Sequence, residues 1–72
     1  MAYYATRTQQ IAANVQEHQL LKFDSKASRD GYCRHESAQP IAAANAHKLM
    51  IADVWRTYQG AGCVFHAARY VA

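Results

Sequence analysis

Two long stretches of the chain repeat their apolar residues at the spacing of an amphipathic helix. The first, residues 4–22, contains neither glycine nor proline. Its apolar face would consist of Tyr4, Ile11, Val15 and His18. Residues three, four or seven positions apart lie on the same side of an α-helix. The pattern therefore predicts a first helix over residues 4–22.

The second stretch begins at Pro40, which suits the first turn of a helix because that turn needs no backbone N–H from it. The stripe that follows consists of Ala43, His47, Met50, Val54 and Tyr58, with Ile51 and Trp55 beside it. Polar residues fall on the opposite side of the helical wheel. A second helix is therefore predicted over residues 40–59, ended by the glycine-rich segment 60–62.

The remaining segments have weaker patterns. Residues 24–39 read DSKASRDGYCRHESAQ and predict a long polar loop, because they include the turn pair Asp-Gly. Sixteen residues without structure are uncommon in a compact domain, so either a short element, such as a brief strand at 31–35, is hidden there or the loop is functional. The tail, residues 63–72, favours a third helix, although its aromatic and valine content also fits a strand.

These elements predict an all-α fold in a single domain over residues 1–72, with a long polar loop at about 24–39. The alternative is an α+β fold with short strands near 31–35 and 63–71. The expected core consists of Ile11, Val15, Leu20, Leu21, Phe23, Leu49, Met50, Ile51, Val54, Trp55, Tyr58, Phe65, Tyr70 and Val71. This core is small for 72 residues. A homodimer or docking on a larger partner would bury more of it.

Composition indicates the cellular location of the chain and the charge of its partners. Its residues are 51% hydrophobic and 18% charged, which is typical of a folded domain. The net charge of +3 favours acidic partners, although acidic residues interrupt every basic run. Two cysteines are too few for a disulfide framework, and no apolar run is long enough to span a membrane. We therefore expect reduced thiols, a cytoplasmic location and no membrane partner.

Candidate metal and catalytic chemistry is sparse. Cys33, His35, Cys63 and His66 offer the two thiolates and two imidazoles of a tetrahedral zinc site. Paired zinc ligands are usually separated by two to four residues, and only one residue separates Cys33 from His35. A nucleophile with a base and an orienting third group is not apparent. The expectation is therefore no cofactor, no metal and no catalysis, with a zinc-stabilised module as an alternative.

The available side chains favour binding instead. We expect a small basic protein that docks on a larger protein or nucleoprotein complex with an acidic surface. Chains of this kind are common among regulators and inhibitors of prokaryotic or viral type. The expected contact residues are Trp55, Arg56, Tyr32, Arg29 and Arg34, because tryptophan, tyrosine and arginine dominate interfaces. The alternative is a small nucleic-acid-binding protein in which Tyr32 stacks on an unpaired base. Its phosphate contacts would be the basic residues Arg7, Lys22, Lys26, Arg29 and Arg34.

Overall fold

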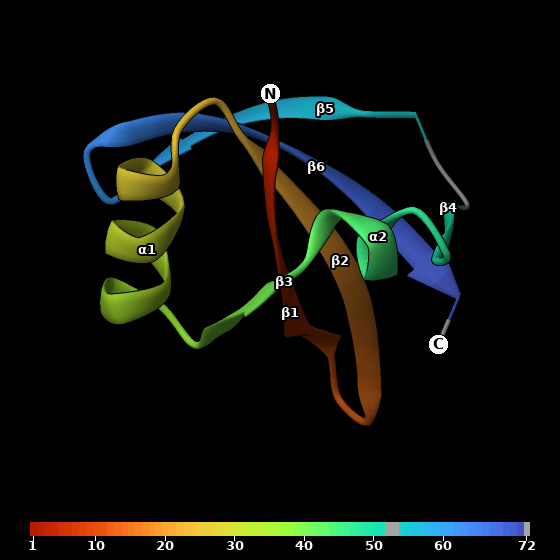
Figure 1. The fold of residues 1–72 in the computed structure, drawn as a ribbon. Coiled ribbons are helices and arrows are strands. Elements are labelled where there is room, and N and C mark those ends of the chain that lie inside the picture. Colours follow the sequence, from red (N-terminus) through yellow and green to blue (C-terminus); the bar gives the residue numbers. More distant parts are fainter. Residues whose placement is uncertain (52–53, 72) are drawn as a thin grey trace.

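The computed structural model describes residues 1–51 and 54–71, and most of these belong to one antiparallel β-sheet (Figure 1). In chain order the elements are β1 (Tyr3–Ala12), β2 (Val15–Phe23), α1 (Lys26–His35), β3 (Ala38–Ile41), α2 (Ala43–Ala46), β4 (Met50–Ile51), β5 (Arg56–Gly60) and β6 (Cys63–Val71). The strand order is β3–β1–β2–β6–β4, and β5 also pairs with β6. The prediction of an all-α, helical protein is therefore wrong.

Residues 4–22 form a β-hairpin in place of the predicted first helix. β1 and β2 pair in antiparallel register along their length. The turn between them contains Asn14 at φ 62°, a left-handed conformation in which asparagine is enriched. The apparent helical spacing runs through this turn. Two of its apolar residues, Ile11 and Val15, lie exposed near the end of the hairpin, so their spacing does not report a buried face.

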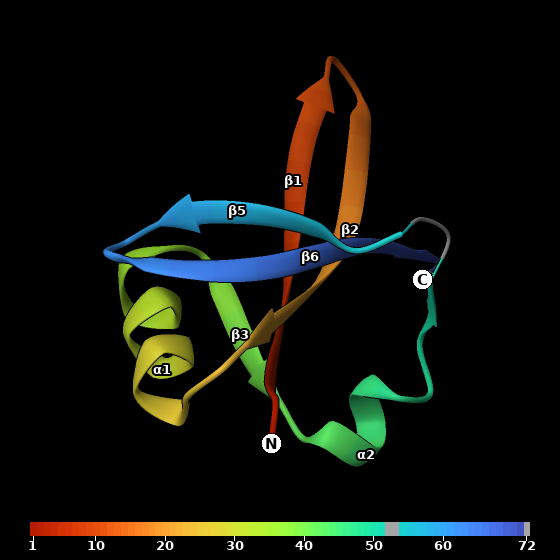
Figure 2. The same cartoon turned by 90° about the horizontal axis from the view of Figure 1, so that it is seen from above.

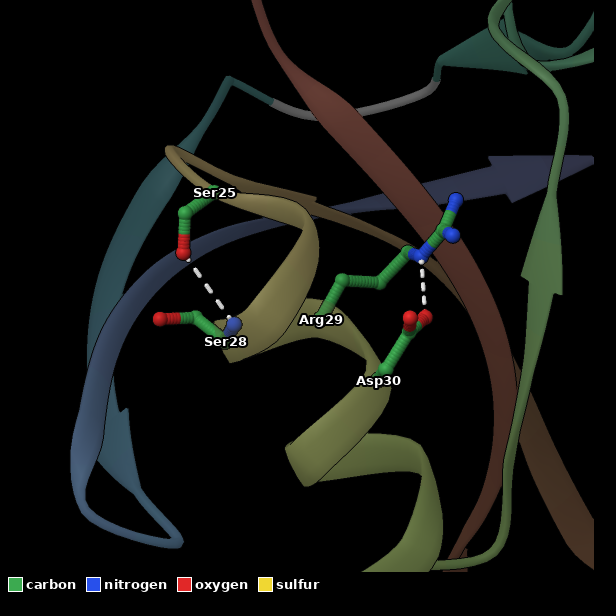
Figure 3. Close-up of polar contacts among 4 residues, drawn as sticks. All are labelled: Ser25, Ser28, Arg29 and Asp30. Carbon is green, nitrogen blue, oxygen red and sulfur yellow. Dashed lines mark hydrogen bonds and ion pairs between the residues drawn. The ribbon is translucent and has the colours of Figure 1, made fainter.

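The polar segment 24–39 contains the longest helix, α1, instead of a loop. The brief strand predicted at residues 31–35 is also wrong, because these residues form the second half of α1. Ser25 begins the helix: its Oγ accepts a hydrogen bond from the backbone N–H of Ser28 at 3.1 Å (Figure 3). Serine is among the preferred residues at this capping position. Helix formation here is therefore locally encoded.

Of the described residues in the predicted second helix, only the four of α2 are helical. Pro40 lies in β3, opposite Ala5 of β1. β3 is an edge strand, where a residue without an N–H is tolerated. The short strands β4 and β5 also begin within the predicted helical range. Residues 52 and 53 of the predicted helix lie outside the described residues.

The tail forms the long strand β6, so the strand alternative for residues 63–71 is confirmed and the third helix is wrong. The glycine-rich segment turns the chain from β5 into β6, with Ala61 at φ 50° and Gly62 at φ 77°. Positive φ at both positions is typical of a tight type I′ hairpin turn. β6 lacks a clean polar–apolar alternation because neighbouring Ala67 and Ala68 are both buried, one on each side of the sheet.

The sheet has a helix on each side. Figures 1 and 2 show α1 and α2 on opposite sides of the β1–β2 hairpin, with β5 and β6 running across it. The core between α1 and the sheet consists of Ala5, Leu21, Phe23, Tyr32, Ala38, Phe65 and Ala67. On the other side of the sheet Leu20 and Ala68 are buried, as is Ala46 of α2. Each side therefore has its own apolar contacts, and the α1 side holds the aromatic ones.

The core contains other residue types than the predicted core does. Leu20, Leu21, Phe23 and Phe65 are buried as predicted. Exposed instead are Ile11, Val15, Ile51, Val54, Tyr58 and Val71. Much of the core that was missed is alanine, at positions 5, 38, 46, 67 and 68. Alanine gives little apolar signal in the sequence, and its burial depends on how closely the strands and helices approach one another.

Candidate functional site

The α2 side of the sheet carries a row of polar and aromatic side chains. Tyr4 of β1 is paired with Lys22 of β2, Lys22 with His66 of β6, and His66 with Thr57 of β5. Residues paired directly in antiparallel strands project to the same face, so the row crosses four strands. Trp55 completes it, because the Lys22 Nζ lies 4.4 Å from the centroid of its ring. These five residues are called the Lys22 patch below.

Contacts within and beside the patch orient its side chains. The Lys22 ammonium lies over the indole of Trp55, a cation–π arrangement. The Oγ1 of Thr57 is 3.1 Å from the Nδ1 of His66. All patch residues except the exposed Thr57 are half-buried. Each side chain is therefore held in place while part of its surface stays accessible to a ligand.

Position 47, just after α2, marks the border of the patch. The ring of His47 meets that of Tyr4 edge to face at 5.6 Å, with the Tyr4 hydroxyl 3.4 Å from its Nε2. A second set of similar side chains lies further along the hairpin on the same face. Thr8 Oγ1 is 3.1 Å from His18 Nδ1, and the rings of His18 and Tyr70 are 5.7 Å apart. The face thus repeats one pairing, an imidazole beside a hydroxyl.

The electrostatics of this face favour anions. On the strands that the structure describes, the only acidic residue is Glu17. Glu17 projects to the α1 side, where it lies 4.0 Å from the Nε of Arg69. Asp30 is on α1, where it pairs with Arg29. No described strand position on the face of Lys22 is therefore acidic.

Two of the predicted contact residues, Trp55 and Arg56, are adjacent in sequence but lie on opposite faces of the sheet. Trp55 belongs to the Lys22 patch. Arg56 is paired with Ala67 of the α1-side core and lines a small pocket of about 30 Å³ with Gln19 and Arg69. A cavity of this size accommodates about one water molecule. The structure therefore does not bring the two predicted contacts together.

The other predicted contact residues lie on α1, on the far side of the sheet. Tyr32 is 2% exposed, so its ring belongs to the core and has no surface to offer a partner. The Nε of Arg29 donates to Asp30 at 3.0 Å, which offsets its charge (Figure 3). The guanidinium of Arg29 also lies 5.8 Å from the ring of Tyr3. Arg34 is exposed in the last turn of α1.

The four residues of the zinc hypothesis do not converge. Cys33 of α1 and Cys63 of β6 pack against the core, and the Cys63 thiol donates to the Gly60 carbonyl at 3.3 Å. His66 projects to the other face, into the Lys22 patch. Across residues 1–51 and 54–71, no three histidine, cysteine or acidic side chains are grouped to hold a metal. The structure thus offers no support for a metal site at these positions.

Both cysteines are free thiols. Burial raises the pKa of the Cys33 thiol above its ordinary value, and the nearby Arg29 guanidinium opposes this shift. A raised pKa keeps a thiol protonated and therefore a poor nucleophile at neutral pH. Cys33 consequently has the properties of a packing residue.

Sequence reasoning identified Trp55 but missed the rest of the patch as a group. Lys22 was noted only as one of several basic residues. His66 was considered as a metal ligand, and Thr57 was not considered. A strand pattern over residues 15–23 would have placed Lys22 and Leu20 on one face, but no local signal pairs Lys22 with His66. That pairing depends on the register of β2 against β6.

Comparisons with protein-family models, with curated proteins and with solved structures found no match to this chain. In the described part of the chain, neither helix is long and apolar enough to cross a membrane. A function is therefore inferred from the geometry and charge of the Lys22 patch.

Proposed function

We propose that this chain binds single-stranded nucleic acid on the Lys22 patch. The observation that carries the proposal is the Lys22 ammonium lying 4.4 Å over the ring of Trp55. A nucleotide presents a phosphate and a flat base. The Lys22 ammonium can contact the phosphate, and the part of the half-buried indole that Lys22 does not cover can stack on the base. Stacking of a base on an aromatic side chain contributes about 1–3 kcal/mol. Bases in a duplex are already stacked, so an unpaired strand is the better ligand.

The surroundings of the pair support the same ligand. The hydroxyl of Thr57 and the imidazole of His66 can donate hydrogen bonds to phosphate or base edges. The strands of this face carry no carboxylate at described positions, and the chain has a net charge of +3. Phosphates that approach this side therefore meet attraction without a nearby acidic side chain on the sheet. We place the protein in the cytoplasm, where its two free thiols would stay reduced.

Trp55 provides a direct test because it is the only tryptophan of the chain. Its fluorescence therefore reports on the patch alone. We would titrate the protein with single-stranded DNA and RNA oligonucleotides of mixed sequence over a series of salt concentrations. The expected result is saturable quenching, with the logarithm of affinity falling linearly with the logarithm of salt concentration. An unchanged tryptophan signal together with no binding by anisotropy of a labelled oligonucleotide would refute the proposal.

Matched charge variants distinguish the patch from general basicity. Lys22→Gln and Lys26→Gln change the net charge equally, but Lys26 is an exposed residue at the start of α1. Lys22→Gln should lower the affinity and reduce the salt slope by about 0.7, the value for one phosphate contact on a single strand. Lys26→Gln should leave both nearly unchanged. Equal losses in the two variants would mean that binding is not located at the patch.

A second candidate function is docking on a protein with an acidic surface. It is favoured by Val64, which is 53% exposed and lies two residues from His66 on the same face of β6. Exposed apolar side chains of this kind are typical of protein interfaces. Val64→Ser would weaken docking on a protein while leaving oligonucleotide binding unchanged. A Val64→Ser variant that loses oligonucleotide affinity would extend the nucleic-acid site to this residue.

A further inference from the structure

The α1 side of the molecule holds a second concavity, away from the Lys22 patch. It is a cleft of about 200 Å³ between the end of β1 and the C-terminal end of α1. Its lining consists of Arg7, Thr8, Gln9, Tyr32, Glu36 and Ser37. The Tyr32 contribution comes from an otherwise buried residue, so the cleft reaches down to the core. The cationic side chain of the cleft lining is the half-buried Arg7.

Arg7 is fixed by neutral acceptors. Its Nε donates to the Oε1 of Gln19 at 2.5 Å, and its Nη1 donates to the hydroxyl of Tyr32. The guanidinium also lies 5.9 Å from the ring centroid of Tyr32 and 5.8 Å from that of Phe65. A guanidinium has five N–H donors, so three are left for other acceptors. Arg7 is therefore oriented before any ligand arrives.

Among residues 1–51 and 54–71, the positive charge of Arg7 has no ionic partner. The two ion pairs found among the described residues are Arg29–Asp30 and Arg69–Glu17, and neither includes Arg7. Burial raises the pKa of Tyr32, although Arg7 opposes the shift, so the phenol stays neutral at physiological pH. Neither acceptor of Arg7 thus carries a charge. An anion in the cleft would supply the negative charge that they lack.

We propose that this cleft binds a phosphate group, held by Arg7 with help from the hydroxyl of Ser37. A tetrahedral phosphate presents several oxygens in different directions, which suits a guanidinium beside a hydroxyl donor. The carboxylate of Glu36 in the lining opposes any anion and limits the affinity. This proposal does not depend on the one for the Lys22 patch, which lies on the opposite face.

The first test is a titration with inorganic phosphate in which the NMR signal of the Arg7 Nε–H is monitored. The wild-type signal should shift saturably, and Arg7→Lys, which keeps the charge and loses the fork, should weaken binding at least about tenfold. Glu36→Gln changes an exposed residue and should bind phosphate about fivefold more tightly, because one repulsive charge is removed. Arg34→Gln, which removes an exposed cation outside the cleft lining, should have no such effect.

Further arms identify the source of the phosphate. Saturation by inorganic phosphate with no preference for a 5′-phosphorylated over a 5′-hydroxyl oligonucleotide assigns the cleft to a small phosphorylated molecule. A preference for the 5′-phosphorylated strand assigns it to a nucleic-acid end. Lys22→Gln should leave the phosphate titration unchanged, which separates this site from the patch. The proposal is overturned if acetate binds as tightly as phosphate, or if neither wild type nor Glu36→Gln responds to phosphate.

Discussion

The two helices cover the two faces of the sheet to very different extents. α1 has ten residues, a side-chain cap at its start, and Tyr32 packed 4.7 Å from the ring of Phe65 and 5.5 Å from that of Phe23. α2 has four residues, and its first flanking residue, Ala42, makes no side-chain capping bond. Its buried residue is Ala46, which contributes a single methyl group. One face is therefore closed by aromatic packing and the other is only partly covered.

Because of this difference, we expect one face of the sheet to determine the stability of the fold and the other to bind the ligand. Apolar burial contributes about 25 cal/mol per Å², so an aromatic ring stabilises the fold far more than one methyl group. The α1 face thus supplies most of the core. The thin cover of α2 leaves the side chains of the Lys22 patch half-exposed. Substitutions on the α1 face should change the free energy of unfolding, whereas substitutions in the patch should change ligand affinity.

The largest expected effect comes from two adjacent residues of β6 that face opposite sides. Phe65 is 3% exposed on the α1 side, and Val64 is 53% exposed on the other. Phe65→Ala should lower the free energy of unfolding by about 3–5 kcal/mol, because the cavity cannot close completely. In a small domain this loss leaves much of the protein unfolded. Urea denaturation followed by circular dichroism measures it.

Val64→Ala is the matched control, with an expected change within about 0.5 kcal/mol. Similar losses in the two variants would mean that the α2 face is as tightly packed as the α1 face. The contrast between the faces would then be incorrect.

The next effect concerns the hydroxyl of Tyr32. Tyr32→Phe keeps the ring in the core but removes the acceptor of the Arg7 hydrogen bond. Hydrogen bonds to charged groups contribute about 1.5–3 kcal/mol, so a loss of about 2 kcal/mol is expected in urea denaturation. The same change in the exposed Tyr58, Tyr58→Phe, should be close to neutral. A neutral Tyr32→Phe would mean that Arg7 finds other partners.

The pH dependence of the same variant follows from burial of the phenol. Burial raises the pKa of Tyr32 above the ordinary value of 10.0, so the folded state holds this proton more tightly than the unfolded state. The corresponding stability is fully present below pH 10 and is lost as the pH rises through the folded-state pKa. Wild type should therefore lose more stability than Tyr32→Phe between neutral pH and strongly alkaline pH. Parallel losses would contradict this assignment.

Sequence patterns predicted local features of this fold and failed for features set by packing. The chain reversal at the glycine-rich segment 60–62 was recognised, although as the end of a helix. The hairpin of residues 4–22 was missed because its exposed Ile11 and Val15 fell by chance at helical spacing. The cap at Ser25 was a readable signal for α1, but the polar composition around it favoured a loop. Burial in β6 depends on cover from both sides, which no local pattern reports.

In the candidate site, too, local sequence predicted some features and missed those that depend on packing. Trp55 was predicted as a contact because of its residue type, and the structure places it in the patch. Its neighbour Arg56 was predicted on the same grounds, but strand alternation sends it to the other face. The pairing of Lys22 with His66 joins residues far apart in sequence. Such a site can be predicted only after strand order and register are known.

A smaller effect tests how α1 is attached to its face. Ser25→Ala removes the Oγ that accepts the Ser28 N–H, and should destabilise the protein by about 1 kcal/mol. Ser28→Ala is the control, because it keeps the backbone N–H and places a good helix former inside α1. Thermal denaturation of the two variants should therefore differ clearly. If Ser28→Ala were the more harmful, its side chain rather than the cap would be the important group.

The smallest effect is expected from giving α2 the cap that α1 has. The backbone of Ala42 is extended, at φ −66° and ψ 146°, and its carbonyl already accepts from the N–H groups of Asn45 and Ala46 at 3.0 and 2.9 Å. Ala42→Ser would add an oxygen that can accept from the N–H of Ala44, two residues later, and stabilise the protein by about 0.5 kcal/mol. Ala44→Ser, inside the helix, should be slightly destabilising. Because α2 covers its face only lightly, oligonucleotide affinity should stay the same in Ala42→Ser. A changed affinity would mean that α2 belongs to the binding surface, and the two helices would then differ in function as well as in packing.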